Sequence, residues 1–363
     1  MPSTPDTWLV LGSAPALAAL KPLTDAHRKQ RPVRVLSNDP VGRGSRRADN
    51  STADTNTARQ EPRPTALEAL TTIGAVTPPG GYPELRDIAA VLVIGDARRS
   101  PRHGLPGLFL HDDTGRRVPV GWLPNLPQRL ATYATAAAKV VKRTKARLAR
   151  GPLILLGQWD DRTLVLAQQT QSAFENVPCP VPVIRWTAER LVQMDMLHAL
   201  RCGPGLAIYF GHGRPRGWAG YHGIRASHLG EALGEPLGAI LSLTCHTANR
   251  WKTSISFAEE MVLTGLCAAA LGATTKTVHL DNGCLTNNLC STLTQAPHAT
   301  LGELLIASPL TDAQAFGPYR VLGDPLAPLL GAEGSLEKAR AIFAPGPDDA
   351  LPPLPDYAEL NPA

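Results

Sequence analysis

Two short apolar segments constrain this chain more than any other feature of its sequence, because a residue that can do chemistry follows each. Residues 206–210 (Leu-Ala-Ile-Tyr-Phe) run into His212, and residues 238–244 (Gly-Ala-Ile-Leu-Ser-Leu-Thr) run into Cys245. Short runs rich in β-branched and aromatic residues indicate buried strands of a parallel sheet. The helix-compatible segment 226–233 would form part of the crossover between them. Functional groups gather beyond the carboxyl ends of such strands. The pattern therefore predicts that His212 and Cys245 lie side by side at one rim of a sheet.

A histidine next to a cysteine is the arrangement that a sulfur nucleophile needs. The imidazole can take the thiol proton, and the thiolate is the reactive form. A cysteine after a strand is more commonly a buried structural residue, so the assignment of Cys245 as nucleophile depends on His212 at the end of the preceding strand. Gly213 would let the backbone turn sharply and leave its N–H unshielded.

Three further histidines lie near this pair in the sequence. His222, His228 and His246 end no apolar strand, and we expect them to be peripheral. His246 is the strongest rival as a base. Its side chain should point away from that of Cys245 if the strand geometry persists, because successive side chains of a strand alternate between the two faces.

Several motifs together resemble the caspase-like cysteine peptidases, and the gingipain-like branch fits best. They are Gly211-His212-Gly213 with Trp218, then Phe257-Ala258-Glu259 after the cysteine, then Tyr319-Arg320-Val321-Leu322-Gly323-Asp324-Pro325. The resemblance covers residues 118–330, and it is the order and spacing of the motifs that make it specific. It implies a caspase-like α/β/α sandwich, His212 and Cys245 as catalytic residues, and no metal or organic cofactor. It also implies an oxyanion hole formed by the backbone N–H groups of Gly213 and Cys245, which would stabilise charge developing during acyl transfer.

Substrate choice would come from a pocket beside the cysteine. Asp160 and Asp161 follow one predicted strand, and Asp281 follows another. A carboxylate in the first pocket would select Arg or Lys before the cleaved bond, and acidic pockets in the gingipain family favour this interpretation. Helix caps or solvated loop acids are equally compatible with the three positions.

Other residues could also shape the pocket. A preference for Asp would instead need an arginine, and Arg214 or Arg250 could supply it. Trp159, Trp218 and Trp251 are candidate pocket walls, and their alternative role is ordinary packing.

Length and patterning predict an α/β chain with a mostly parallel sheet in two consecutive αβ subdomains. The subdomains would span residues 1–150 and 151–330, with a Pro/Ala-rich tail at 331–363 and a mobile, polar loop at 43–64. Strands are predicted at 7–12, 32–36, 89–95, 118–122, 153–157 and 274–280 besides the two above. Helices are predicted at 15–28, 126–150, 163–174, 188–200 and 259–271.

Composition bounds the function. The formal net charge of +5 is mildly basic, but no module with interleaved basic and aromatic residues is present, so we expect no direct nucleic-acid binding. No run approaches about 20 apolar residues, and we expect no membrane span. The six cysteines lack the paired spacing of a zinc site. The first strand lacks a preceding basic region, so it does not read as a signal peptide, and we expect a cytoplasmic protein.

Two functions follow from this sequence. The first is a cysteine endopeptidase that acts on protein or peptide substrates and is restrained by a regulatory complex or a zymogen step. The second is a catalytically lapsed relative kept for protein interaction or scaffolding. Intact His212 and Cys245 at both strand ends favour the enzyme.

Overall fold

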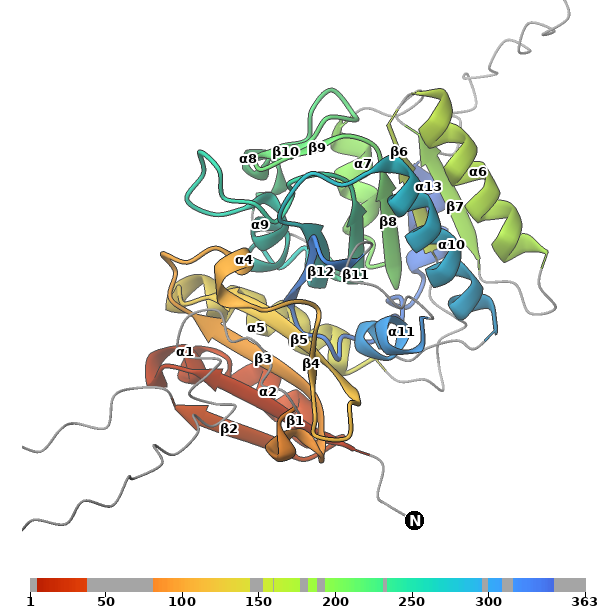
Figure 1. Cartoon of the computed structure of the whole chain (residues 1–363). Coiled ribbons are helices and arrows are strands. Elements are labelled where there is room, and N and C mark those ends of the chain that lie inside the picture. Colours follow the sequence, from red (N-terminus) through yellow and green to blue (C-terminus); the bar gives the residue numbers. More distant parts are fainter. Residues whose placement is uncertain are drawn as a thin grey trace, which may run out of the picture.

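The computed structural model contains one long mixed sheet that crosses the whole molecule (Figure 1). It describes residues 5–37, 81–143, 153–158, 160–176, 182–187, 193–230, 234–295, 300–308 and 316–342. Along the sheet the strands are ordered β2-β1-β3-β5-β13-β12-β11-β8-β6-β7, and β4 pairs with β5. Four predicted parts lie outside the described residues: the loop 43–64, residues 144–150 of the predicted helix 126–150, Trp159 and residues 343–363 of the tail.

The first part of the sheet comes from the N-terminal third of the chain. Its strands are β1 (Thr7–Gly12), β2 (Val33–Ser37), β3 (Ile88–Gly95), β4 (Phe109–His111) and β5 (Arg117–Pro124). The helices are α1 (Ala14–Ala19), α2 (Lys21–Arg28), η1 (Pro83–Leu85), α4 (Pro101–Gly104) and α5 (Pro127–Val141). Strands β1, β2, β3 and β5 pair in parallel, as the sequence predicts for this part of the chain.

The second part of the sheet carries the two segments with His212 and Cys245. Its strands are β6 (Leu153–Gly157), β7 (Val183–Thr187), β8 (Leu206–Phe210), β11 (Leu237–Leu243), β12 (Cys267–Ala273) and β13 (Tyr319–Gly323). The short pair β9 (Gly213–Arg214) and β10 (Gly217–Trp218) forms a separate hairpin. The helices are α6 (Asp161–Glu175), α7 (Gln193–Leu200), α8 (Ala226–Leu229), α9 (Phe257–Leu263), α10 (His279–Gln295), α11 (Leu301–Ala307) and α13 (Ser335–Ile342).

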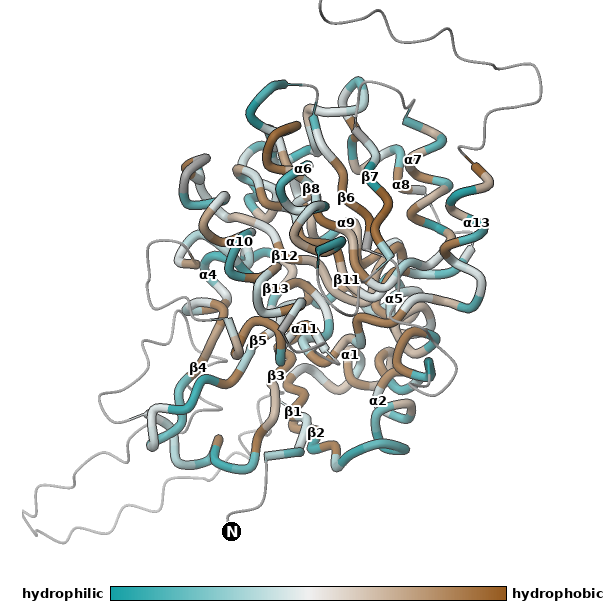
Figure 2. Tube along the Cα trace, turned by 90° about the vertical axis from the view of Figure 1, so that its right-hand side faces the viewer, coloured by the Kyte–Doolittle hydropathy of each residue, from teal (hydrophilic) through white to brown (hydrophobic). Residues whose placement is uncertain are grey.

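Strand β13 joins the two parts, because it is parallel to β5 and antiparallel to β12. Helices α1, α2, α5 and α9 pack together on one face of the sheet, and α6, α10 and α11 pack together on the other (Figure 1). The strands are the hydrophobic centre of the molecule, and the outer turns of the helices are hydrophilic (Figure 2). The α/β/α class and the mostly parallel sheet are thus confirmed. The sheet is continuous across residue 150, and the division into two subdomains stays a prediction.

One prediction in the second part was wrong. Residues 259–271 were expected to be one helix and 274–280 a strand, but α9 ends at Leu263 and residues 267–273 form strand β12. The chain reverses at Gly265, whose φ of 73° is accessible to glycine. The alanine-rich segment of β12 has a helical propensity, but every residue in it is buried in the centre of the sheet. Burial between two helical layers overrides that propensity.

Other boundaries differ in smaller ways. The predicted helix 15–28 is divided into α1 and α2 at Leu20, and the sequence analysis did not identify strands β4, β7 and β13. Helix α13 lies within the predicted Pro/Ala-rich tail. Within the described ranges, no helix combines the length and apolar character needed to cross a bilayer.

A buried hydrogen bond ties the end of the sheet to the N-terminal helices. Nε2 of His27 lies 2.7 Å from Oδ2 of Asp324, and both side chains are almost fully buried. The ring of Trp8 packs against that of His27, with 4.2 Å between the centroids. Asp324 belongs to the Leu-Gly-Asp-Pro motif after β13, so this motif connects residues at opposite ends of the chain.

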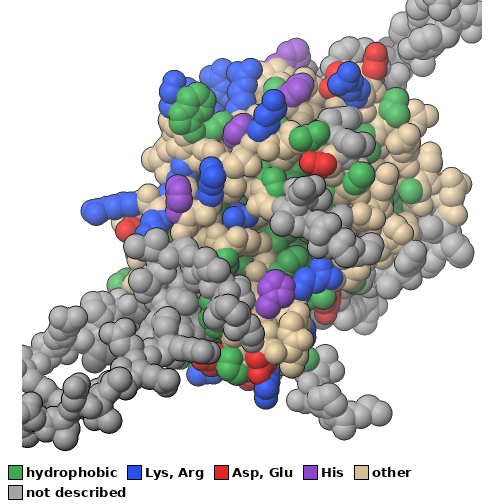
Figure 3. All heavy atoms as spheres, in the orientation of Figure 1, with side chains coloured by type: hydrophobic (Ala, Val, Ile, Leu, Met, Phe, Trp, Pro, Cys, Tyr) green, Lys and Arg blue, Asp and Glu red, His purple; other side chains and the backbone are tan. Residues whose placement is uncertain are grey.

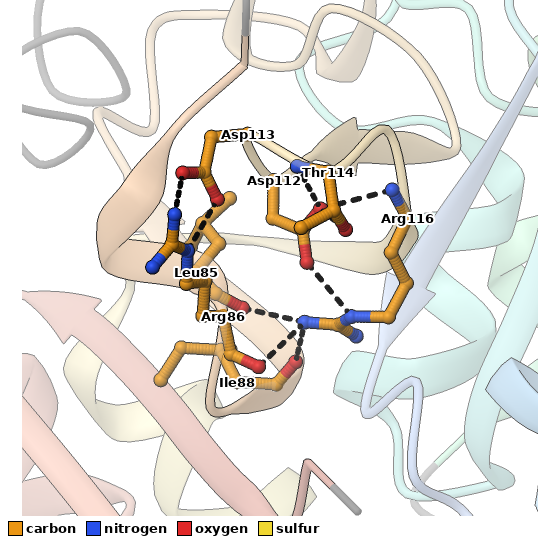
Figure 4. Close-up of polar contacts among 7 residues, drawn as sticks. All are labelled: Leu85, Arg86, Ile88, Asp112, Asp113, Thr114 and Arg116. Carbon is orange, nitrogen blue, oxygen red and sulfur yellow. Dashed lines mark hydrogen bonds and ion pairs between the residues drawn. The ribbon is translucent and has the colours of Figure 1, made fainter. Parts of the chain in front are cut away.

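A second buried carboxylate, Asp112, organises the turn between β4 and β5 (Figure 4). Oδ1 accepts hydrogen bonds from the backbone N–H groups of Thr114 and Arg116, each at 2.9 Å, and Oδ2 accepts one from Nε of Arg116 at 2.9 Å. Nη2 of Arg116 continues to the carbonyl of Ile88 at 3.0 Å. Burial raises the pKa of Asp112, but the hydrogen bonds from Thr114 and Arg116 outweigh it and lower the pKa below its ordinary value.

We expect Asp112→Asn to lower the free energy of unfolding by about 2 kcal/mol at neutral pH, because buried donors lose a charged acceptor. A carboxyl group with a lowered folded pKa stabilises the fold above the unfolded pKa of about 3.9, and this contribution disappears as the pH falls through the folded pKa. The difference between wild type and variant, measured by urea unfolding, should therefore shrink below about pH 4. Asp113→Asn, whose partner Arg86 is exposed, is the control and should change stability much less. A difference that stays constant from neutral to acidic pH would contradict this role of Asp112.

Candidate active site

The parallel pairing of β8 with β11 brings His212 close to Cys245. The register pairs Tyr209 with Ser242 and Phe210 with Leu243, so each of the two functional residues follows the last pair by two positions. The carboxyl ends of parallel strands meet at the same edge of a sheet, and this edge also holds the ends of β6 and β12.

Gly213 allows the two strand ends to approach closely. A Cβ atom built on Gly213 would lie 2.5 Å from the carbonyl oxygen of Cys245 and 2.6 Å from Cγ2 of Thr244. Any side chain at this position would push the segment after β8 away from the segment after β11. The glycine is therefore required here by space.

The sulfur of Cys245 is partly exposed and is held by Thr277. The backbone N–H of Thr277 points at Sγ with an N···S distance of 3.3 Å. The hydroxyl and the carbonyl oxygen of Thr277 each lie 3.5 Å from Sγ. The N–H donates to the sulfur, whereas the carbonyl oxygen can only accept a hydrogen bond from the thiol.

A buried polar network behind the sulfur fixes the hydroxyl of Thr277. Nδ2 of Asn282 donates to Oγ1 of Thr277 at 3.1 Å and to the carbonyl of Leu243 at 3.2 Å. The hydroxyl of Tyr319 donates to Oδ1 of Asn282 at 2.6 Å, and burial raises the pKa of Tyr319, which keeps its proton in place. Oγ1 of Thr277 therefore accepts a hydrogen bond from Asn282 while it lies next to Sγ of Cys245. The sequence analysis did not identify Thr277, Asn282 or Tyr319 as site residues.

His212 lies on an exposed turn whose backbone is fixed. Its N–H donates to Oε1 of Gln158 at 2.8 Å, and its carbonyl accepts the N–H of Ala219 at 2.9 Å. Gln158 follows β6 directly, and its own N–H donates to the carbonyl of Phe210 at the end of β8. The only sequence signal for Gln158 is its position after a buried strand.

His246, the rival base, is held differently. Its φ is 61°, an uncommon value for a residue other than glycine, and its N–H donates to the carbonyl of Thr275 at 3.0 Å. Burial, followed by the charge of Lys276, lowers the pKa of His246. Of the other two histidines, His222 is exposed and His228 accepts the backbone N–H of Arg225 at 3.1 Å.

The two described tryptophans of the predicted pocket have opposite environments. Trp218 is 3% exposed, stacks on Tyr209 at 4.2 Å between centroids, and donates from Nε1 to Oγ of Ser242 at 2.7 Å. These are packing contacts that brace β8 against β11. Trp251, by contrast, is 68% exposed.

The three predicted pocket acids also differ. Asp160 is the N-cap of α6, and its carboxylate accepts the N–H of Thr163 at 3.1 Å and the hydroxyl of Thr163 at 2.7 Å. Asp161 is exposed in the first turn of α6. Asp281 does not end a strand, as the sequence had indicated, but lies in the first turn of α10, directly before Asn282.

The two arginines considered for an Asp-selective pocket are also separated by the structure. Arg214 is exposed on β9. The guanidinium of Arg250 forms a bidentate ion pair with the buried carboxylate of Glu259, with 2.8 Å between Nε and Oε2. Glu259 also accepts from Nε1 of Trp122 at 3.3 Å and from the N–H of Ser256 at 2.9 Å. This ion pair occupies Arg250 and fixes the segment that follows Cys245.

The chain is similar to known peptidases. A family model described as "Peptidase family C25" matches residues 130–330. The crystal structure of the Arg-specific cysteine proteinase gingipain R has a TM-score of 0.61 and 12% identity, covering 90% of this chain and 79% of that chain. A complex of the RgpB pro- and mature domains from Porphyromonas gingivalis has a TM-score of 0.59 and 14% identity, covering 89% of this chain and 79% of that chain. No curated protein matches the chain. At these identities the two structures show a shared fold.

Proposed function

This chain is a cysteine peptidase that belongs to peptidase family C25, and we propose that it is an endopeptidase with Cys245 as nucleophile and His212 as general base. The observation that carries this proposal is the pairing of β8 with β11, after which His212 and Cys245 occupy equivalent positions. The donors of Thr277 around Sγ support the same assignment.

In the proposed reaction His212 takes the proton of the Cys245 thiol. The sulfur attacks the peptide carbonyl, and the backbone N–H groups of Gly213 and Cys245 bind the oxyanion. His212 then gives the proton to the leaving amine as the C–N bond breaks. Water, deprotonated by His212, hydrolyses the thioester and releases the carboxylic acid and the thiol. The N–H of Thr277 stabilises negative charge on the sulfur between these steps.

We further propose that the enzyme cleaves after Arg or Lys. Asp281 is the best-supported acid for the pocket, because it precedes Asn282, whose amide bonds to Leu243 and Thr277 next to Cys245. Asp160 is the weakest candidate, because both of its carboxylate oxygens already accept hydrogen bonds from Thr163. The similarity to the Arg-specific proteinase gingipain R supports a preference for a basic residue before the cleaved bond, but it does not identify the acid that binds this residue.

We expect a peptide library to be cut mainly after Arg and Lys, and Asp281→Asn to lower kcat/KM for an Arg peptide by about thirtyfold, which corresponds to about 2 kcal/mol for a charge-assisted contact. Alkylation of Cys245 by iodoacetamide should change little, since this reagent does not use the pocket. Asp161→Asn is the matched variant on α6, and a larger effect there would transfer the role to Asp161. Cleavage mainly after Asp or small apolar residues would contradict an acidic pocket.

Location and control are also part of the proposal. We propose that the peptidase acts in the cytoplasm and is restrained there by a regulatory protein or a zymogen step. Five cysteines in the described part of the chain are free thiols, which supports a reducing compartment. Cell fractionation tests the location. Weaker probe labelling of Cys245 in fresh lysate than in the purified protein is the expected sign of restraint, and equal labelling would contradict it.

A further inference from the structure

A groove of about 700 Å³ lies beside the segment that follows Cys245, and the proposed reaction does not use it. The segment between β3 and α4, with α4 itself, forms one wall, and the segment after β11 forms the other. The residues that matter here are Arg98, Arg102, His103, Asn249, Arg250 and Trp251. Lys, Arg and His side chains gather over α4, α8 and the β9–β10 hairpin, with few acidic side chains among them (Figure 3).

The groove carries positive charge from Arg98 and Arg102, which form no ion pair within the described residues. No Asp or Glu is among the described residues that line it. Arg98 and Arg102 are exposed, and neither forms an ion pair with a carboxylate of the described residues. The nearest acid in sequence is the exposed Asp96, whose carboxylate accepts the backbone N–H of Arg98 at 2.9 Å and offsets part of this charge.

The floor and one wall of the groove are rigid. Arg250 pairs with Glu259, so its charge is cancelled, and Nη1 of Arg250 bonds to the carbonyl of Ala97 on the opposite wall.

Trp251 at the rim of the groove is 68% exposed, and Nζ of Lys252 lies 4.7 Å from its ring centroid. This cation–π contact places a further positive charge near the rim.

A buried arginine adds to the positive potential from below. Arg320 on β13 donates to the carbonyls of Gly317 and Tyr319, at 2.8 Å and 2.7 Å, and to that of Pro106 at 3.3 Å. Burial, followed by the charge of Arg102, lowers the pKa of Arg320 to about 10, so it stays protonated at neutral pH. Its bonds to neutral carbonyls leave its charge in place.

The groove lies on one side of Cys245, and Asp160 and Asp161 lie on the other. Along the sheet edge the strands follow the order β6, β8, β11 and β12, so Asp160 and Cys245 are two strands apart. Thr274, which follows β12 on the other side of Cys245, lines the groove. Helix α10 packs on α6, but its first turn, with Asp281, lies near Leu243 and Tyr319, at the ends of β11 and β13. Adjacent strands are about 4.8 Å apart, so four or five extended residues of a substrate span this row.

We propose that this groove binds acidic side chains of the peptide substrate, on the side of the scissile bond away from the basic residue that enters the first pocket. This inference rests on the proposed endopeptidase function and names its substrate class. A basic side chain would meet the acids near β6, and one or two carboxylates would meet Arg98 and Arg102. The two ends of this sheet edge would then bind side chains of opposite charge, and this would fix the direction in which the peptide lies.

The test uses quenched fluorescent peptides with one Arg at the cleavage position. One carries two Glu residues two to four positions beyond Arg, one carries them before Arg, and one carries Gln at all these positions. We expect the peptide with Glu beyond Arg to be cleaved with about tenfold higher kcat/KM than the Gln peptide, and an advantage only for the peptide with Glu before Arg would contradict the proposal. The advantage should fall between about 0.1 M and about 1 M salt, because exposed charges are screened.

The variant Arg98→Gln/Arg102→Gln should reduce this advantage to nearly one while it leaves cleavage of the Gln peptide unchanged. Lys29→Gln/Arg340→Gln removes the same charge from exposed positions elsewhere and should keep the full advantage. An equal loss of the Glu-peptide advantage in both double variants would show a general charge effect and would contradict binding of acidic side chains in the groove. So would equal cleavage of all three peptides by the wild type.

A binding arm separates the groove from the reaction. The Cys245→Ala protein should bind a labelled Glu peptide about tenfold more tightly than the Gln peptide, and Arg98→Gln/Arg102→Gln should remove the difference. Failure to cleave any peptide would contradict the proposed function. The binding measurement would still show whether the groove binds acidic side chains. Binding of a single-stranded oligonucleotide of equal charge, at least as tight as that of the Glu peptide, would overturn the assignment to acidic peptides.

Discussion

Replacing Cys245 by alanine is expected to lower peptide cleavage by about a thousandfold or more, because the proposed reaction passes through a thioester on the Cys245 sulfur. The variant should fold normally, since the side chain is partly exposed and, within the described residues, its hydrogen bonds are to Thr277. A Cys-reactive peptide probe should label the wild type once and the variant not at all, as shown by intact mass.

Cys284→Ala is the matched control for labelling, because Cys284 is an exposed thiol on α10. Labelling and cleavage should persist in this variant. Burial raises the pKa of Cys290 to about 12, so this thiol should stay unreactive at neutral pH. Normal cleavage by Cys245→Ala would contradict the assignment of the nucleophile. Loss of labelling in Cys284→Ala would show that the probe reacts with Cys284 instead.

His212→Ala should cause a loss similar to that of Cys245→Ala, since the two residues act as a unit. The control is His246→Asn, which tolerates the positive φ at this position and removes the rival base. If His246→Asn lost activity and His212→Ala kept it, the base would be His246.

The second large effect is expected at Glu259, which is buried without any exposed surface. Glu259→Gln would leave the guanidinium of Arg250 buried without its partner, and breaking a buried pair in this way costs about 3 kcal/mol or more. We expect a matching decrease in the free energy of unfolding, measured with guanidinium chloride. Cleavage should also weaken beyond the loss of folded protein, because Arg250 and Ser256 fix the segment after Cys245.

The neighbouring acid supplies the control for this prediction. Glu260 on the same helix pairs with Arg129, but this pair is partly exposed. Glu260→Gln should therefore cost about 1 kcal/mol or less. Equal losses of stability in the two variants would show that burial of the Glu259 pair is not the cause.

Much of the site could be predicted from sequence because its two central residues follow short apolar strands. An apolar run of five to seven residues closed by glycine or a polar residue is a local signal, and β8 and β11 lie where it places them. The parallel pairing then follows from the crossover between them. The same local signal identified β1, β3 and β6.

Local patterns were misleading where burial opposed propensity. The segment 267–273 contains four alanines and was interpreted as helix, although it is the fully buried strand β12. That error also placed Asp281 at the end of a strand instead of at the start of α10. Helical propensity is a weak preference, and the position of β12 between β11 and β13 decided the outcome.

The sequence by itself determined which residues end the central strands, since each strand and its last residue are adjacent in the chain. Only the tertiary structure decided what surrounds them. Thr277 and Asn282 reach Cys245 and Leu243 from over thirty residues away, and Tyr319 in turn bonds to Asn282 from another distant segment. Hydrogen bonds and ion pairs between distant segments depend on how helices and strands pack, and no periodicity in the sequence encodes a partner at that separation. For the same reason Arg98 and Trp251, from separate parts of the chain, became neighbours in one groove only once the sheet was assembled.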